Sequence, residues 1–546
     1  MFFSFLGILE AQLWSGLRSY GGANQDYLEK VDFNAPDDRI VFTFLLSNSY
    51  KIDNTSGSDF VMIMVNPYGS SVWERVIGSS RLNEWVYEID YDQNNDILVG
   101  GISCTPDGGS ISFCSRLPSD TNEGFVIRLN RNNGSFINAI RIRDLFGQPD
   151  IGNYLRVLGL KSTNDGGFVI GGEIAHERQQ NNAWVSTTQG FIAKFNNSMN
   201  LQWIRVVGDT TTNILDYRGI TSVLQANDNN IIAVSTSRNG IWVGKFNVIN
   251  GNLIWQRFYN RTRNSQVTKL SWAKLASDGS IIIADHINNN NHSDVLFVKL
   301  NSDGNFVCAR QFGTVMNDAG IDITEGQNYY YITGFWYNAN PNGYMFYAKI
   351  NKTDCSLSSV RYLLGMDGEG RGIVVRGGIP YIVGWSNYSQ WSNGNYDGIL
   401  AADSGIQDTC YWRTWIPEVN QSISLVSGSN WNIYNATVNI RSHNYTSVSI
   451  NVSKKAMCGY LTPVNKPEYY EDCFVSISKK DGFLYISSNS ENINSIKIYN
   501  VNGKVIYEGS FNSKMVKIPI SVRTSIYVID VNFQKYKLRR KVFIGG

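Results

Sequence analysis

The stretch Trp203-Ile-Arg205-Val-Val-Gly208 returns elsewhere in the chain, and its recurrence decides the fold. Trp73-Glu-Arg75-Val-Ile-Gly78 repeats it closely, and Trp255-Gln-Arg257 shares its first half. Weaker copies raise the total to seven marked arginines, which lie 51 to 66 residues apart: Arg18, Arg75, Arg141, Arg205, Arg257, Arg310 and Arg361. A repeat of this length indicates a small structural unit that stacks on copies of itself.

Two further patterns precede each arginine. One is an apolar strand with a basic residue that ends in Asn, as in Phe191-Ile-Ala-Lys194-Phe-Asn196. The other is a turn followed by a β-branched strand, as in Asp165-Gly-Gly-Phe-Val-Ile-Gly-Gly172. Each repeat therefore contains about four strands joined by Asn, Asp and Gly turns. Seven such repeats predict a seven-bladed β-propeller, which we assign to residues 12–403.

Loop lengths predict the order of strands within a blade. Short turns make hairpins, and the link of about ten residues after the arginine strand is long enough to cross to the next blade. The arginine strand is therefore expected to be outermost. The strand of Arg18 then lacks a blade of its own, so we expect it to pair with residues 399–403 and close the ring. We interpret the seven arginines as structural, in ion pairs or covering apolar surface with their stems.

Composition excludes several classes of function. The chain has 546 residues, 17% charged and 13% aromatic, with a net charge of +2. This balance predicts no nucleic-acid partner. No apolar run reaches 18 residues, so we expect no membrane-spanning helix. Only four histidines and no Cys-x-x-Cys occur, so neither a metal site nor a cofactor is predicted.

The chain start and the cysteines suggest export. Residues 1–11 contain a short apolar run, which we interpret as a signal peptide or an N-terminal strand. In an extracellular chain the seven cysteines would leave one unpaired. The disulfide candidates are Cys104 with Cys114, Cys308 with Cys355, and Cys410 with Cys458, which leaves Cys473 over.

The loops after the Gly-Gly strands are the candidate binding face, because they are long, differ between repeats and are expected to lie on one side. We expected them to be irregular, for example over residues 173–189, 285–292, 335–343 and 385–396. The candidate ligand-binding residues in them are Trp184, Trp336, Tyr337, Trp385, Tyr388 and Trp391. Aromatic and amide side chains suit sugar rings and protein interfaces alike. The alternative is that these aromatics pack down to hold the loops.

No catalytic motif is evident. The chain lacks Gly-x-Ser-x-Gly, His-Glu-x-x-His and a phosphate-binding loop, and we predict no catalytic residue and no enzyme. The run from Asp90 to Asp96 resembles part of a calcium loop, but it falls where other repeats have a hairpin turn, so we interpret it as a turn. A pair of carboxylates from distant blades near the central channel would instead indicate a glycan-active enzyme.

The C-terminal third differs in composition. Residues 404–472 are rich in Ser, Thr and Asn and predict a small β-segment or linker. Residues 473–546 carry 12 Lys and Arg against 4 Asp and Glu, and they predict a compact β-sandwich. Its strands include Ser495-Ile-Lys-Ile-Tyr499, then Gly503-Lys-Val-Ile-Tyr507, Ser525-Ile-Tyr527-Val-Ile-Asp530 and a basic last strand.

These C-terminal strands resemble the sorting domain of type IX secretion in Bacteroidota, and the propeller resembles the secreted beta-propeller-repeat proteins that often carry such a tail. The resemblance implies export across the outer membrane, followed by anchoring or release. We therefore expect an extracellular or cell-surface, non-catalytic propeller that acts by binding or self-assembly. Its partners would be copies of itself, other cell-surface proteins or glycans. The alternative is a secreted carbohydrate-binding or glycan-active protein.

Overall fold

The computed structural model describes the strands and short turns of the chain. The described residues are 16–20, 26–34, 39–46, 59–66, 70–79, 82–104, 122–144, 152–180, 183–208, 219–236, 240–261, 272–289, 292–337, 343–363, 368–387, 396–403, 412–427, 433–435, 438–442, 446–449, 454–459, 475–480, 483–488, 492–499, 504–519, 525–532 and 537–544. They form an all-β structure without a helix in these ranges. The chain divides into two compact units, Met1–Met457 and Cys458–Gly546.

The described strands of the first unit form seven sheets of five strands, which we number sheets 1 to 7. The strands of each sheet are given in order from the first to the last. Sheet 1 consists of β2 (Asp26–Asn34), β3 (Arg39–Leu46), β4 (Phe60–Val65), β5 (Ser71–Gly78) and β34 (Thr446–Ser449); sheet 2 of β6 (Asn83–Tyr91), β7 (Ile97–Cys104), β8 (Asn122–Leu129), β9 (Phe136–Asp144) and β33 (Val438–Ser442); sheet 3 of β10 (Gly152–Ser162), β11 (Phe168–Gln180), β12 (Ala183–Phe195), β13 (Leu201–Val207) and β32 (Ile433–Asn435); and sheet 4 of β14 (Ile220–Gln225), β15 (Ile231–Thr236), β16 (Gly240–Phe246), β17 (Leu253–Asn260) and β31 (Val426–Ser427). Sheet 5 consists of β18 (Ala273–Leu275), β19 (Ile281–Asn289), β20 (His292–Leu300), β21 (Phe306–Gly313) and β30 (Val419–Ile423); sheet 6 of β22 (Asp318–Glu325), β23 (Tyr329–Tyr337), β24 (Gly343–Asn351), β25 (Leu357–Leu363) and β29 (Trp412–Trp415); and sheet 7 of β26 (Gly368–Arg376), β27 (Ile379–Ser386), β28 (Asp397–Ala402), β1 (Gly16–Tyr20) and β35 (Lys454–Gly459).

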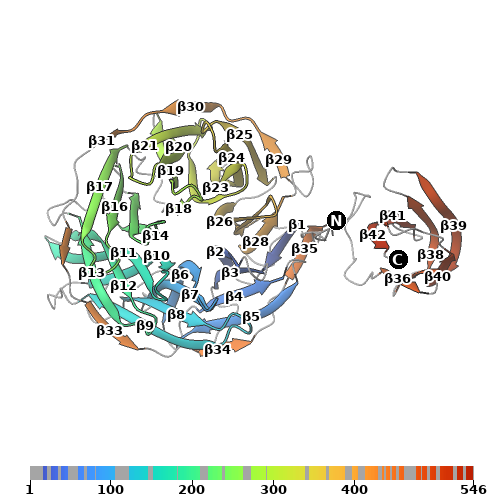
Figure 1. The fold of residues 1–546 in the computed structure, drawn as a ribbon, viewed down its shortest axis with the longest axis horizontal. Coiled ribbons are helices and arrows are strands. Elements are labelled where there is room, and N and C mark those ends of the chain that lie inside the picture. The colour runs from blue at the N-terminus through green and yellow to red at the C-terminus, as the bar shows by residue number, and fades with distance from the viewer. Residues whose placement is uncertain are drawn as a thin grey trace, which may run out of the picture. The chain divides into compact units, whose positions relative to one another are not determined.

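The sheets are arranged like the blades of a propeller, with their first strands toward a common centre (Figure 1). The predicted order of the first four strands is confirmed in every sheet. The predicted pairing of the Arg18 strand is also confirmed, because β1 pairs with β28 from Gly16 opposite Ala402 to Tyr20 opposite Gly398.

The arginine strands are not outermost, and that prediction was wrong. A fifth strand, supplied by residues 412–459, pairs outside each arginine strand. We call this segment the strap. It runs around the rim of the ring and adds β29 to sheet 6, then β30, β31, β32, β33 and β34 to sheets 5 to 1, and finally β35 to sheet 7 (Figure 1). Because pairing satisfies the open N–H and C=O groups of an edge strand, the strap protects the rim of every sheet.

A repeated ion pair fixes the turn between the first two strands of a sheet. The basic residue of the third strand contacts the acid of that turn in four sheets, at 3.0, 2.9, 2.8 and 3.0 Å: Arg128 with Asp92, Lys194 with Asp165, Lys245 with Asp228, and Lys299 with Asp278. In the turn near Asp92, the carboxylate also accepts hydrogen bonds from the N–H groups of Asn94 and Asp96. The run that resembles a calcium loop is therefore a turn, as we interpreted it.

The Trp-x-Arg pattern joins neighbouring sheets. Trp203 donates its indole N–H to the carbonyl of Val248 in the next sheet at 2.8 Å, and Trp73 does the same to Arg131. Arg75 donates to the carbonyl of Asn133 at 2.7 Å. Arg141 and Arg361 instead make ion pairs, such as that of Arg361 with Asp403 at 2.7 Å. The structural interpretation of these arginines is therefore supported wherever their contacts are described.

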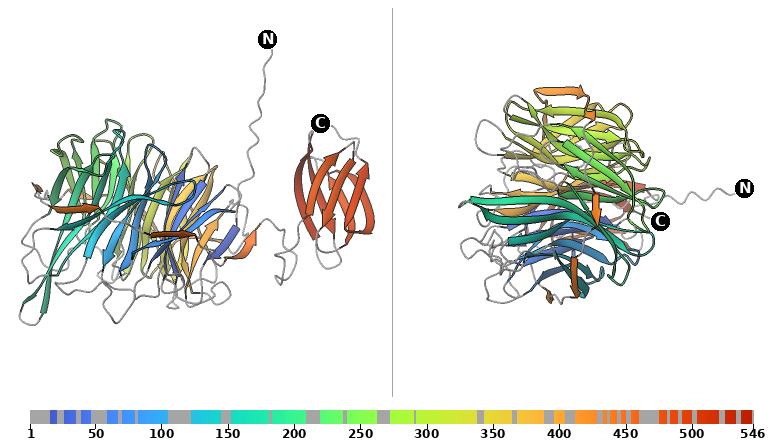
Figure 2. Two further views of the ribbon diagram at one scale, coloured as in Figure 1. Left: turned by 90° about the horizontal axis from the view of Figure 1, so that it is seen from below. Right: turned by 90° about the vertical axis from the view of Figure 1, so that its left-hand side faces the viewer.

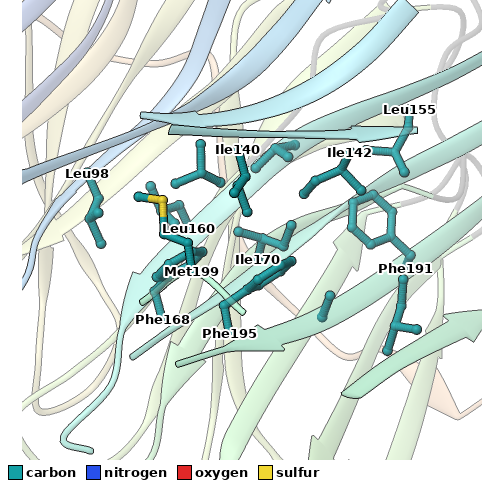
Figure 3. Close-up of a cluster of buried hydrophobic side chains, with 14 of the residues drawn as sticks. Leu98, Ile140, Ile142, Leu155, Leu160, Phe168, Ile170, Phe191, Phe195 and Met199 are labelled. Atoms are coloured by element: carbon teal, nitrogen blue, oxygen red, sulfur yellow. The ribbon is translucent and has the colours of Figure 1, made fainter. Parts of the chain in front are cut away.

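Apolar side chains fill the space between neighbouring sheets. Figure 3 shows one such cluster, in which Leu98 and Ile140 of sheet 2 lie against Leu160, Phe168 and other side chains of sheet 3. The buried side chains of this cluster are at most 5% exposed. Similar clusters lie between the other sheet pairs from sheet 7 through sheet 1 to sheet 6, and each excludes water from both neighbouring sheets.

Three of the expected loops are instead continuations of hairpins. Residues 173–189 extend β11 and β12, which pair as far as Gln180 opposite Ala183, and this hairpin projects beyond the neighbouring strands (Figure 2, teal). Strands β19 and β20 likewise pair to Asn289 opposite His292, and β23 and β24 pair to Tyr337 opposite Gly343. The expectation of irregular loops was wrong there, because backbone pairing extends each hairpin beyond the stretch that the repeated apolar pattern of the sequence marks.

The second unit contains two described sheets. One consists of β36 (Val475–Lys480), β37 (Phe483–Ser488) and β40 (Met515–Pro519), and the other of β39 (Val505–Ser513), β38 (Ile493–Tyr499), β41 (Ser525–Asn532) and β42 (Lys537–Ile544). Apolar side chains from both sheets share one buried cluster, which includes Ile486, Ile496 and Ile518. The basic strand β42 lies at a sheet edge, beside β41.

Candidate functional site

The six predicted binding aromatics do not come from one sheet. Trp336 lies on β23 and is 9% exposed, because the rings of Tyr344 and Tyr362 pack against it at 5.4 and 5.1 Å. This environment corresponds to the alternative in which the aromatics hold the loops. Trp336 therefore offers little free ring surface to a ligand.

The other predicted aromatics lie on three different sheets or outside the described residues. Trp385, on β27, is half-buried and meets Tyr396 edge to face at 5.1 Å. Trp184 lies opposite Gln179 in the projecting hairpin, and Tyr337 ends β23. Tyr388 and Trp391 lie outside the described residues.

The centre of the ring is built by a bulge that recurs in the first strands. Six of these strands carry one extra residue at matching positions: Glu29, Tyr87, Leu158, Thr221, Ile321 and Arg371. A bulge bends its strand and turns a side chain out of the regular alternation. Four of these residues line one cavity at the axis, namely Glu29, Tyr87, Ile321 and Arg371.

Trp272 occupies this axis. It is 5% exposed, and its indole N–H donates to the carbonyl of Leu158 in sheet 3 at 3.4 Å. The ammonium of Lys30, from sheet 1, lies 3.9 Å from the centre of the indole ring and 3.3 Å from the carboxylate of Glu88. The remaining cavity is only about 10 Å³, which is about the space of one water molecule. The sequence analysis did not single out Trp272, because this residue lies outside the repeated Trp-x-Arg pattern.

Two carboxylates lie near the axis on neighbouring first strands. Burial, together with the nearby Asp90 carboxylate, raises the pKa of Asp32 to about 7. Asp90 itself contacts the ammonium of Lys161 at 2.6 Å. The side chains of Lys161 and Lys274 are 41% and 38% exposed, so solvent reaches this group of charges. A carboxyl whose pKa lies near neutrality beside one that is ion-paired is an arrangement suited to proton transfer.

A second buried carboxyl lies between sheets 1 and 2. Glu84 is fully buried, and burial, with a contribution from Asp59, raises its pKa to about 8. It accepts a hydrogen bond from Ser103 at 3.1 Å and lies 3.7 Å from the guanidinium of Arg141. Among the described residues no group of three or more His, Cys, Asp or Glu could hold a metal ion.

The described cysteines support an oxidising location. Cys308 and Cys355 form a disulfide between sheets 5 and 6, as the sequence suggested. Cys104 is also disulfide-bonded, while its predicted partner Cys114 lies outside the described residues. Cys410 lies outside them as well, and Cys458 is on β35, so that pairing stays a prediction.

Comparison with known families identifies the end of the chain. Residues 480–545 match the family of the secretion system C-terminal sorting domain, which confirms the resemblance to the type IX sorting domain. The chain is therefore secreted to the cell surface or the extracellular space. No helix in the described residues is long and apolar enough to cross a membrane. No curated protein matches the chain.

Several solved structures resemble the chain at low identity. The Dos1 propeller is 8% identical and covers 71% of this chain and 95% of its own, with a TM-score of 0.36. A Dyadobacter fermentans protein of unknown function is 10% identical, with coverages of 71% and 99% and a TM-score of 0.35. An exo-beta-1,3-galactanase from Clostridium thermocellum is 12% identical, with coverages of 70% and 78% and a TM-score of 0.26.

Proposed function

We propose that the chain is a seven-bladed β-propeller with a C-terminal β-sandwich, and that it acts at the cell surface as a non-catalytic protein, by binding or by self-assembly. The observation that carries this proposal is the strap, because it pairs with all seven sheets and covers the edges of a ring that buried apolar clusters between the sheets hold together. A rigid ring is suited to presenting loops and hairpins at constant spacing.

The axis supports the same proposal. Trp272 and Lys30 fill the centre, and the cavity beside them has the volume of about one water molecule. Ligand sites for small molecules usually enclose roughly 300–1,000 Å³. The described parts that remain for a partner are therefore the projecting hairpin of β11 and β12 and the rim.

Electron microscopy of the native secreted protein, with mass spectrometry of both chain ends, tests the proposal. Ordered polymers or layers that keep the terminal segments would support self-assembly. Monodisperse rings that bind neither a copy of themselves nor any surface component of the producing cell would overturn it.

A second candidate function is carbohydrate processing near the axis. The observation that favours it is the pair Asp32 and Asp90: burial raises the pKa of Asp32 to about 7, and the Asp90 carboxylate contacts the ammonium of Lys161 at 2.6 Å. Incubating the protein with a panel of polysaccharides, beside an Asp32→Asn variant, tests this candidate. Sugar release that the variant lacks would establish it, and no release from any polysaccharide would remove it.

A further inference from the structure

Parts of the strap are paired with the ring over only a few residues. Strand β31 pairs with β17 at only two positions, and β32 pairs with β13 at three. The side chains of Val426 and Ser427 are exposed. Short pairings with few buried side chains open at a low free energy compared with a core strand.

One end of the strap is anchored. Trp412, in its first strand, is fully buried, and its ring meets that of Tyr347 edge to face at 5.1 Å. Farther along, the apolar contacts of the strap are only partly buried, as at Ile423 and Ile440. The strap therefore has a buried anchor at its beginning on sheet 6, and its shortest described pairings lie on sheets 4 and 3.

The strap is also outermost, so its removal would leave the first four strands of each sheet intact. The inter-sheet cores, the turn ion pairs and the tryptophan contacts all lie inside it. What would be exposed is the edge of each arginine strand. Peeling of the strap therefore requires no unfolding of the ring.

The strap is the covalent connection between the ring, which ends at Asp403, and the second unit, which contains the sorting domain. We infer that the strap is a stored tether. Where the predicted Cys410–Cys458 disulfide is absent or reduced, pulling the ring and the second unit apart makes the strap leave the sheets one at a time from the Gly459 end, first sheet 7 and then sheets 1 to 6 in order. About 50 residues would be released, or ~160 Å when extended. This inference rests on the proposed role of the ring at the cell surface.

Single-molecule force spectroscopy on the full chain tests the tether. One attachment tag is inserted beside Ile249, which is 82% exposed, and the other between residues 460 and 474, so that the second unit bears no load. Cys410→Ser and Cys458→Ser prevent the predicted disulfide from bridging the strap. We expect several small extension steps that total ~160 Å, all at lower force than the unfolding of the ring.

A matched variant shows which step belongs to which strand. Trp412→Ala should lower the force of the last strap step and leave the earlier steps unchanged, because Trp412 anchors only β29. A first extension that already includes ring unfolding would overturn the inference, and so would strap release in one step. Neither result affects the proposed function, since polymers or surface binding are observed without load.

Discussion

Cys308 and Cys355 join sheets 5 and 6 at the place where other neighbouring sheets use a tryptophan and a glycine. Trp203 packs on Gly251 and Trp255 on Gly304, and these glycines have positive φ angles of 67° and 75°. Cys355 occupies the corresponding position of its turn and also has a positive φ, of 58°. Its N–H donates a hydrogen bond to the carbonyl of Asn351, just as the N–H of Gly251 donates to the carbonyl of Asn247. Cys308 stands at the tryptophan position of the repeated pattern, so the disulfide replaces one stacking contact of the series.

This equivalence predicts that the two kinds of junction are exchangeable. The double variant Cys308→Trp, Cys355→Gly should fold with nearly unchanged stability, and that stability should not respond to a reductant. Cys308→Ala alone should lose about 2–4 kcal/mol, because it removes the crosslink and supplies no ring. Urea unfolding with and without reductant checks both values. A double variant no more stable than the single one would contradict the equivalence.

Two glycines with the same backbone conformation should differ in their tolerance of alanine. Gly251→Ala would place a methyl group 2.6 Å from the Trp203 ring, whereas at Gly378, with a φ of 77°, no atom lies within 4 Å. Gly378→Ala should therefore cost about 1 kcal/mol, from backbone strain alone. Gly251→Ala should cost about 3 kcal/mol or more, because strain and overpacking add. Equal losses in thermal unfolding would show that the ring contact contributes nothing.

Glu84 should make the ring less stable as the pH rises. Its pKa is about 8 in the folded chain and 4.5 in the unfolded chain, so between these values the folded state binds the proton more tightly. The stabilisation is complete below about pH 4.5 and is lost as the pH rises to about 8. Glu84→Gln should reduce this slope, with Asp32 contributing the remainder, and raise the melting temperature at pH 8 relative to the parent chain.

Melting temperatures from pH 5 to 8 check this prediction. Glu418→Gln, which changes an exposed carboxylate on the strap, is the matched control and should keep the slope. If the parent chain is as stable at pH 8 as at pH 5, the role assigned to Glu84 is refuted.

The topology gives the Cys410–Cys458 prediction a physical basis. The strap begins on sheet 6 with Trp412 and ends on sheet 7 with Gly459, and these sheets are neighbours, since β22 contacts β26. A disulfide between the two cysteines would close the strap into a hoop around the ring. Peptide mapping without reduction should recover the two cysteines in one linked fragment. A link from either of them to Cys473 would refute the pairing.

The strand order of the sheets could be predicted because each repeat carries its own local information. Turn residues such as Asp165 mark the hairpins, and the spacing from Gly208 to Gly219 distinguishes a crossing from a turn. The partner of the Arg18 strand followed by elimination, because one repeat was split between the chain ends. These features depend on neighbours in the sequence, which a repeat displays several times.

The strap and the axis could not be predicted in the same way. Each strap strand is two to six residues long and mostly polar, and the partner of Val426, for example, is Asn260. The strap pairs through backbone N–H and C=O groups, which nearly every residue has, so no pattern of side chains in the sequence predicts this pairing. Trp272 follows the same logic, because it reaches the axis once in the chain and has no repeated counterpart.

Sheet 7 also decides when the molecule can be completed. It combines β1, from the beginning of the described chain, with β26, β27 and β28 and with β35, so its strands emerge from the ribosome far apart in time. Contacts between residues so distant in sequence form slowly, because a long loop must close before any pairing is gained. Strand β1 therefore cannot pair until residues 397–402 have been made, and the outer edge of its sheet is not covered until residues 454–459 have been made. Until then the sheet of the nascent chain is incomplete, and its open strand edges could pair with strands of other chains.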